Sequence, residues 1–135
     1  METLDDNFAG LITDIQAVLD PELLKKPYRE RNKTNPMFGH CYVATEAFYH
    51  LTKDEWPGRF TIFHGKDDEG IVHWWLHDNH RTKILDITAD QYYSDGKNPP
   101  YEKGRRGSFL TNDPSKRAVI VMNRAIERSS TKNES

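Results

Sequence analysis

Apolar residues recur with a helical period near the start of the chain. Over residues 4–19 they return every three or four positions, as at Leu11, Ile15 and Val18. This spacing predicts an amphipathic helix with one buried face.

Two further helices are expected later in the chain. One runs from Gly39 or His40 to Leu51, and the other begins at Asp113 as its N-cap, with Pro114 in its first turn. Between the first two helices, residues 25–38 are basic and contain Pro27 and Pro36. We expect no regular element there.

The pattern changes in the middle of the chain. Residues 59–64, 71–77 and 82–87 are rich in aromatic and β-branched side chains, and short polar turns separate them. They predict about three antiparallel strands. The order of elements indicates an α+β fold, in which N-terminal helices and a C-terminal helix pack on a small sheet. Residues 94–112 are expected to form a long irregular loop, the kind of segment that often carries function.

Composition and charge narrow the class of protein. The 135 residues suit a single domain, expected over residues 1–127 with a disordered tail over 128–135. The net charge of −2 argues against a general nucleic-acid-coating protein. No apolar run has the length of a membrane span, the first 20 residues contain no Lys or Arg, and there is one cysteine. We therefore expect a cytoplasmic protein with no membrane association and no disulfide.

The single cysteine, Cys41, is the first candidate for chemistry. It is predicted to lie at a helix N-terminus, directly after His40 and Gly39. Unpaired backbone N–H groups at that end favour a thiolate over a thiol. The alternative is that Cys41 is a small buried residue of the core.

A histidine and an aspartate on neighbouring predicted strands strengthen the catalytic interpretation. With a turn centred near Asn79, His73 lies nearly opposite Asp86. Side chains opposed on one face of a sheet come close enough to interact. A carboxylate that accepts the imidazole N–H would orient the ring toward Cys41 and support its protonated form.

These residues carry a resemblance to a known superfamily. Gly39-His40-Cys41, His73-Trp74-Trp75 and Leu85-Asp86-Ile87-Thr88 resemble the transglutaminase-like branch of the papain-like cysteine superfamily, over roughly residues 35–90. The resemblance implies a papain-like fold and a catalytic triad of Cys41, His73 and Asp86, with Asn35 as the amide that stabilises the oxyanion. Ile87 stands where the branch often has a proline. The chain is also similar to small uncharacterised proteins of bacteriophages and bacteria, which would place it in a host cytoplasm if it is phage-encoded.

The expected activity is that of a cysteine-dependent hydrolase or acyl transferase acting on an amide-type bond of a protein or small molecule. Peptidase, amidase and deamidase activities remain open. One alternative is a non-catalytic binding or inhibitor protein on the same fold, and another is a nucleotide or nucleic-acid binder. The oligomeric state is left open.

Candidate substrate contacts come from four places along the chain. They are His40 beside the cysteine, Trp75 after the histidine, Asp90 and Gln91 after the aspartate, and Tyr101, Arg105 and Arg106 in the long loop. The two arginines suggest an anionic partner, and the alternative, that these charges belong to solvated loops of a slightly acidic protein, is the simpler interpretation. No cofactor or metal is expected. His73 and His77 would lie roughly 13 Å apart along one strand and could not share an ion.

Overall fold

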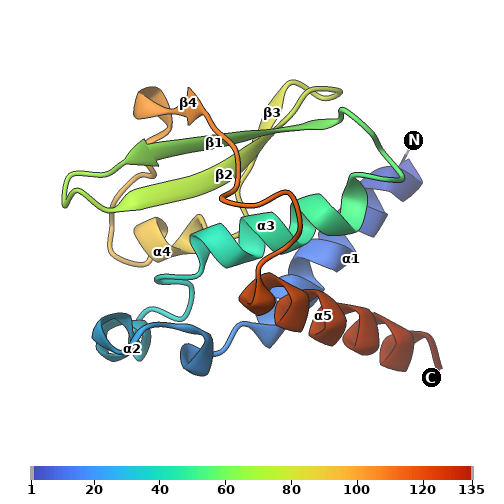
Figure 1. The fold of residues 1–135 in the computed structure, drawn as a ribbon, viewed down its shortest axis with the longest axis horizontal. Helices are drawn as coiled ribbons and strands as arrows, with labels where there is room; N and C mark the ends of the chain where they lie inside the picture. Colours follow the sequence, from blue (N-terminus) through green and yellow to red (C-terminus); the bar gives the residue numbers. More distant parts are fainter. Residues whose placement is uncertain (1, 135) are drawn as a thin grey trace.

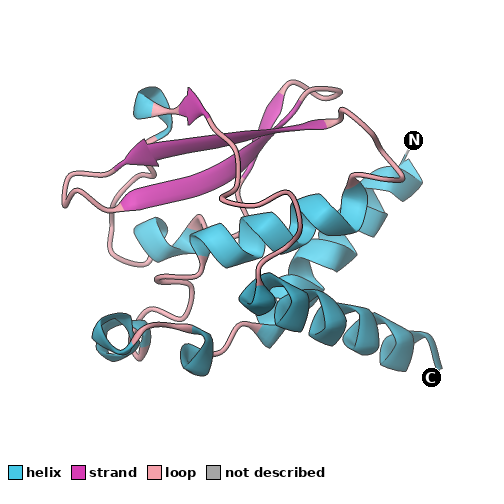
Figure 2. Ribbon diagram, viewed as in Figure 1, coloured by secondary structure: helices cyan, strands magenta, loops and turns pink. Residues whose placement is uncertain are grey.

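The computed structural model describes residues 2–134, with side chains described for residues 8–131. It confirms the α+β class: helices pack beneath an antiparallel sheet (Figures 1 and 2). The elements are α1 (Glu2–Val18), η1 (Pro21–Leu23), α2 (Lys26–Asn32), α3 (Cys41–Thr52), β1 (Phe60–Lys66), β2 (Val72–Asp78), β3 (Lys83–Leu85), α4 (Asp90–Tyr93), η2 (Tyr101–Lys103), β4 (Arg105–Arg106) and α5 (Lys116–Glu134).

The core lies between the sheet and the long helices. Figure 1 shows α3 beneath the sheet and α5 below α3, with α1 running from beside the end of α3 down to α5. Phe8 and Ile15 from α1, Phe48 from α3, Leu76 from β2 and Val121 from α5 are buried together. Burial of these apolar faces is the main contribution that holds the layers together.

The sheet has four strands among the described residues, in the order β3-β2-β1-β4. The sequence predicted about three. The additional strand, β4, pairs Arg105 and Arg106 with His64 and Phe63 of β1. Two residues within a loop rich in Gly and Pro carry no alternating pattern, so this strand had no signal in the sequence.

The register of the second hairpin differs from the expected one. Leu85 of β3 pairs with Leu76 of β2, so Asp86 comes level with Trp75 rather than with His73. This is a shift of two positions, which leaves every side chain on its predicted face because the period of a strand is two. The pairing of His73 with Asp86 therefore survives as a diagonal contact.

The helices differ from the expectation in two places. Residues 26–32, where no regular element was expected, form α2. Its proline, Pro27, lies in the first turn, where proline is tolerated. The last helix begins at Lys116, and the Ser115 hydroxyl, not Asp113, caps it by accepting the Ala118 N–H at 3.2 Å. That helix continues to Glu134, through the segment expected to be a frayed tail. Within the described residues, no helix has both the length and the apolar character required to cross a membrane.

Candidate active site

The start of α3 holds Cys41 in a fixed place. Asn32 donates hydrogen bonds to the carbonyls of Pro36 and Phe38, at 3.0 and 2.9 Å, and so fixes the loop before the helix. Gly39 follows with φ of +84°, and a Cβ at this position would lie 2.9 Å from Leu24 Cδ2. A glycine is therefore needed for the chain to turn into α3, whose first residue is Cys41.

His73 and Asp86 form a buried pair next to this helix start. His73 Nε2 lies 2.6 Å from Asp86 Oδ2, and the two side chains are only 0% and 3% exposed. His73 comes from the beginning of β2, and Asp86 directly follows the end of β3. The sequence prediction that this histidine and this aspartate meet is thus realised in the structure.

The Cys41 thiol acts on the same imidazole ring. Its hydrogen is directed toward the Val72 carbonyl, with an Sγ···O distance of 3.6 Å. His73 Nδ1 is buried and has no hydrogen-bond partner in this geometry. Cys41 nevertheless interacts with the ring, because it is one of the groups that raise the pKa of His73. Rotation about the Cβ–Sγ bond would redirect the thiol hydrogen without moving a heavy atom.

The environment of His73 favours its protonated form. Burial on its own lowers the pKa of this imidazole. The hydrogen bond with Asp86, the interaction with the Cys41 thiol and the charges of both groups outweigh that effect and raise the pKa to about 9. A protonated ring at neutral pH is the partner that a thiolate requires.

Tyr101 completes the surroundings of Asp86. Its hydroxyl donates to Asp86 Oδ2 at 2.7 Å, the same oxygen that contacts His73, while Asp86 Oδ1 accepts the Thr88 N–H at 3.2 Å. Burial, together with the Asp86 charge, raises the pKa of the Tyr101 hydroxyl, which keeps it a donor. Tyr101 was expected to contact substrate. In the structure it holds the carboxylate that orients His73.

A cavity of about 400 Å³ opens beside Cys41. Its lining is uncharged and mostly apolar or aromatic: Tyr28, Phe38, Gly39, Cys41, Tyr42, Gly70, Ile71, Val72, Trp74 and Gln91. These residues come from α2, the start of α3, the β1–β2 turn, β2 and α4. This volume falls in the range of ordinary small-molecule sites.

Trp75 was expected to contact substrate, but in the structure its neighbour Trp74 lines the cavity. Trp75 is 2% exposed and stacks on His73, with ring centroids 5.6 Å apart, so it lies behind the ring rather than at the cavity. Trp74 lines the cavity and contacts the Tyr42 ring edge to face at 4.9 Å. Successive side chains of a strand point to opposite faces of the sheet, so Trp74 and Trp75 have different surroundings.

Of the two predicted site residues Asn35 and Gln91, only one lines the cavity. Gln91 lines the cavity. Asn35 is buried but does not line it: its Nδ2 donates to the Gln91 carbonyl at 2.7 Å and approaches Asp95 Oδ2 at 3.4 Å. Asn35 therefore anchors α4, the helix that carries Gln91.

His40 and Asp90 lie outside the cavity lining. His40 is 1% exposed, and burial lowers its pKa to about 4 despite the charge of Asp20. It is thus a neutral residue beneath the start of α3. Asp90 is exposed and accepts a hydrogen bond from the Ser94 hydroxyl at 3.3 Å.

The cations of the long loop do not reach Cys41 either. Arg105 and Arg106 are exposed on β4, at the sheet edge next to β1. Lys97 pairs with Glu69 at 3.5 Å, and Lys103 pairs with Asp68 at 3.5 Å. The structure thus gives the expected anionic partner no cation in the cavity lining.

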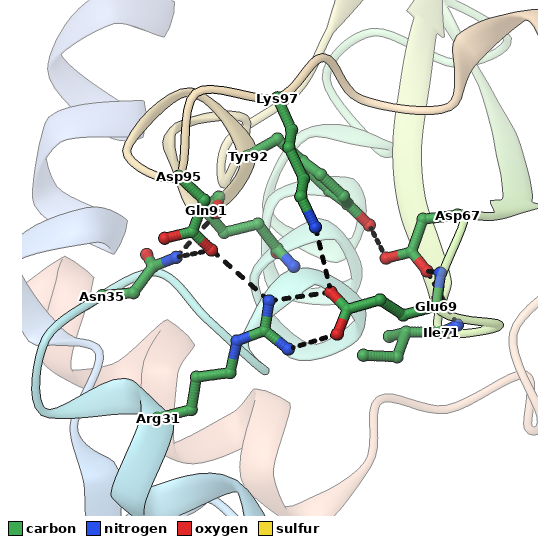
Figure 3. A network of polar contacts seen from close by, with 9 residues as sticks. All are labelled: Arg31, Asn35, Asp67, Glu69, Ile71, Gln91, Tyr92, Asp95 and Lys97. Atoms are coloured by element: carbon green, nitrogen blue, oxygen red, sulfur yellow. Dashed lines mark hydrogen bonds and ion pairs between the residues drawn. The ribbon is translucent and has the colours of Figure 1, made fainter.

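A second cavity, of about 330 Å³, adjoins the first and shares Phe38 and Gln91 with it. A polar network runs along this cavity (Figure 3). Arg31 contacts both Glu69 oxygens, at 3.0 and 2.8 Å, and reaches Asp95 at 3.4 Å. Among the described residues, no group of three His, Cys, Asp or Glu side chains is arranged to hold a metal ion.

Comparison with known proteins gave no match. No family model, no curated protein and no solved structure matches this chain.

Some of these residues had no signal in the sequence. Tyr28 belongs to a segment that we expected to be irregular, Phe38 lies within the turn before α3, and Ile71 directly follows the turn after β1. Tyr42 was the most accessible to prediction, because it directly follows Cys41. Cavity residues contributed by four separate elements are brought together only by the tertiary fold.

Proposed function

We propose that this protein is a cysteine-dependent hydrolase or acyl transferase of the papain-like, transglutaminase-like kind, acting on an amide-type bond. The observation that carries the proposal is the position of His73: its Nε2 lies 2.6 Å from Asp86, its Nδ1 is buried without a hydrogen-bond partner, and Cys41 is one of the groups that raise its pKa. In such an arrangement the aspartate orients the imidazole, and the imidazole exchanges a proton with the thiol. The adjoining cavity supplies space for the acyl group.

The chemistry follows from these roles. The Cys41 sulfur forms a bond to the carbonyl carbon, and the electron pair of the C=O bond moves onto oxygen. Collapse of this intermediate breaks the C–N bond, and the amine leaves with the proton that His73 delivers. In the second half, His73 takes a proton from water or an amine, which attacks the acyl carbon and releases the Cys41 sulfur.

The negative oxygen of the intermediate needs hydrogen-bond donors. Cys41 begins α3, and the first backbone N–H groups of a helix have no partner within the helix. The Cys41 N–H is therefore the donor that we assign to the oxyanion. The Asn35 amide nitrogen, which hydrogen-bonds to the Gln91 carbonyl, is not assigned to this role.

The test exploits the fact that Cys41 is the only cysteine of the chain, so any thiol adduct reports on this residue alone. We expect iodoacetamide to alkylate the native protein at pH 6 at least tenfold faster than it alkylates the same protein with His73→Gln. A p-nitrophenyl ester should leave an acyl group on native protein but not on Cys41→Ser, as measured by intact mass. The control is His77→Gln, which changes a histidine of the same strand that has no contact with Cys41 or Asp86 among the described interactions.

A thiol that reacts no faster in the native protein than in His73→Gln would contradict the proposal. It would indicate that Cys41 is a core residue, and it would favour the non-catalytic binding protein.

A further inference from the structure

The cavity beside Cys41 differs from the surface around it in charge. None of its lining residues is acidic or basic, and four of them, Tyr28, Phe38, Tyr42 and Trp74, present aromatic rings. Aromatic walls favour flat or bulky apolar groups, and placing a charge among them costs solvation free energy.

One polar side chain interrupts this lining. Gln91 is 4% exposed, and its Oε1 is buried without a hydrogen-bond partner. A buried amide that the protein leaves unpaired is destabilising unless another group binds it. Because an amide both donates and accepts hydrogen bonds, Gln91 suits a neutral polar group, such as the amide next to an acyl carbon.

The neighbouring cavity adds an electrostatic constraint. Its lining holds five carboxylates against two cations: Asp67, Asp68, Glu69, Asp95 and Glu102 against Arg31 and Lys97. Both cations are already paired with Glu69. The resulting negative potential lies directly behind the shared wall of Phe38 and Gln91, so it repels an anionic group bound beside Cys41.

We propose that the cavity beside Cys41 binds an uncharged acyl group with an aromatic side chain, and that Gln91 pairs with the neutral amide of that group. This inference rests on the proposed function, because it names the acyl substrate of the same cysteine. It also replaces the anionic partner that the arginines of the long loop had suggested.

The experiment compares three peptidyl chloromethyl ketones that share one warhead and one backbone. Their side chains at the residue next to the warhead are those of phenylalanine, lysine and aspartate. The second-order rate of Cys41 modification is followed by intact mass, and the rate with iodoacetamide is measured in parallel. We expect the phenylalanine probe to react at least tenfold faster than the lysine probe, and the aspartate probe to be the slowest.

A positive charge placed in the cavity wall should shift the preference toward the anionic probe. Ile71→Lys places a cation at the cavity wall, so we expect the aspartate-to-phenylalanine rate ratio to rise at least tenfold relative to the native protein. The matched control is Ile84→Lys, which adds the same charge on β3 at an exposed position outside both cavities. That variant should leave the ratio unchanged.

The outcomes separate the two proposals. Rapid reaction with iodoacetamide combined with equal rates for the three probes, or with a preference for a charged one, would overturn the aromatic-substrate inference alone. A thiol inert to iodoacetamide and to every probe would overturn the proposed function, and this inference with it.

Discussion

At the scale of single residues, opposing effects set the pKa of His73. Burial disfavours its charged form, whereas Asp86 and Cys41 favour it, and the result is a pKa of about 9. Asp86 in turn is held by Tyr101 and by the Thr88 N–H. The protonation of this imidazole on β2 thus depends on contacts from α3, the segment after β3, and η2.

We predict that Asp86→Asn lowers the pKa of His73 from about 9 to well below that value. The substitution removes the negative charge that stabilises the imidazolium, while burial, which lowers the pKa, remains. The measurement is a titration of the His73 ring resonances by NMR. The native ring should lose its proton near pH 9, and the ring in the variant at a lower pH.

The control for this titration is Asp90→Asn. Asp90 is an exposed carboxylate a few residues later, and it does not contribute to the pKa of His73. Its removal should leave the titration in place. An unchanged midpoint in Asp86→Asn would show that the short contact in the structure does not govern the ring.

At the scale of elements, the turn between β1 and β2 is held over the cavity by side chains from two helices. Asp67 Oδ1 accepts the N–H groups of Glu69 and Ile71, both at 2.9 Å, and Asp67 Oδ2 accepts the Tyr92 hydroxyl at 2.8 Å. Arg31 of α2 contacts Glu69 from the other side (Figure 3). These contacts position Ile71 as part of the cavity wall.

We predict that Glu69→Gln loosens this turn at little cost to global stability. The ion pair with Arg31 is solvent-exposed, and such pairs contribute little to the free energy of unfolding. Amide hydrogen exchange over residues 67–71 should become several-fold faster. The free energy of unfolding, measured with urea, should stay close to the native value.

The matched control is Glu30→Gln, which removes an exposed ion pair with Lys33 on α2, away from the turn. It should leave exchange over residues 67–71 unchanged. If Glu69→Gln also leaves that exchange unchanged, the internal hydrogen bonds of Asp67 are sufficient to fix the turn.

Some helices and strands could be predicted from the sequence, and others could not. Strong periodic patterns located α3, β1 and β2 to within a residue or two, because each buries one face against the core. The face shared by His73 and Asp86 was predictable even though the register was displaced, since a shift of two preserves the face. In contrast, α2 begins with a proline and β4 has two residues, so neither has a period that a pattern can show.

The cavity and the network around it were not predictable in this way. The contact between Arg31 and Glu69 joins residues 38 positions apart, and that between Asn35 and Gln91 joins residues 56 positions apart. Only the packing of α2 and α4 at the same end of α3 brings them together. Trp75 stacks on His73, and Trp74 lines the cavity. Both placements likewise depend on which face of the sheet packs on α3.

At the scale of the whole molecule, the candidate site and the terminal helices occupy different regions. The cavity lining comes from α2, the start of α3, the β1–β2 turn, β2 and α4, and among the residues whose side chains are described it contains none of α1 or α5. Figure 1 shows α5 below α3, on the side away from the sheet, whereas α1 reaches the sheet through the contact of Phe8 with Phe60. The described residues of α5 therefore contribute to stability through the core and lie outside the candidate site.

This separation predicts that Val121→Ala destabilises the protein without changing the reactivity of Cys41. Val121 of α5 is 0% exposed within the core, so truncation removes two buried carbon atoms and leaves a small void. The free energy of unfolding should fall by about 2 kcal/mol, and Tm should fall by roughly 5–10 °C. At 25 °C, where the variant remains folded, the iodoacetamide rate should stay within about twofold of the native rate, because no cavity residue has moved. Val119→Ala, on the same helix but 38% exposed, is the control and should shift Tm much less. A fall in the alkylation rate that parallels the loss of stability would show instead that α5 sets the geometry of the site through α3.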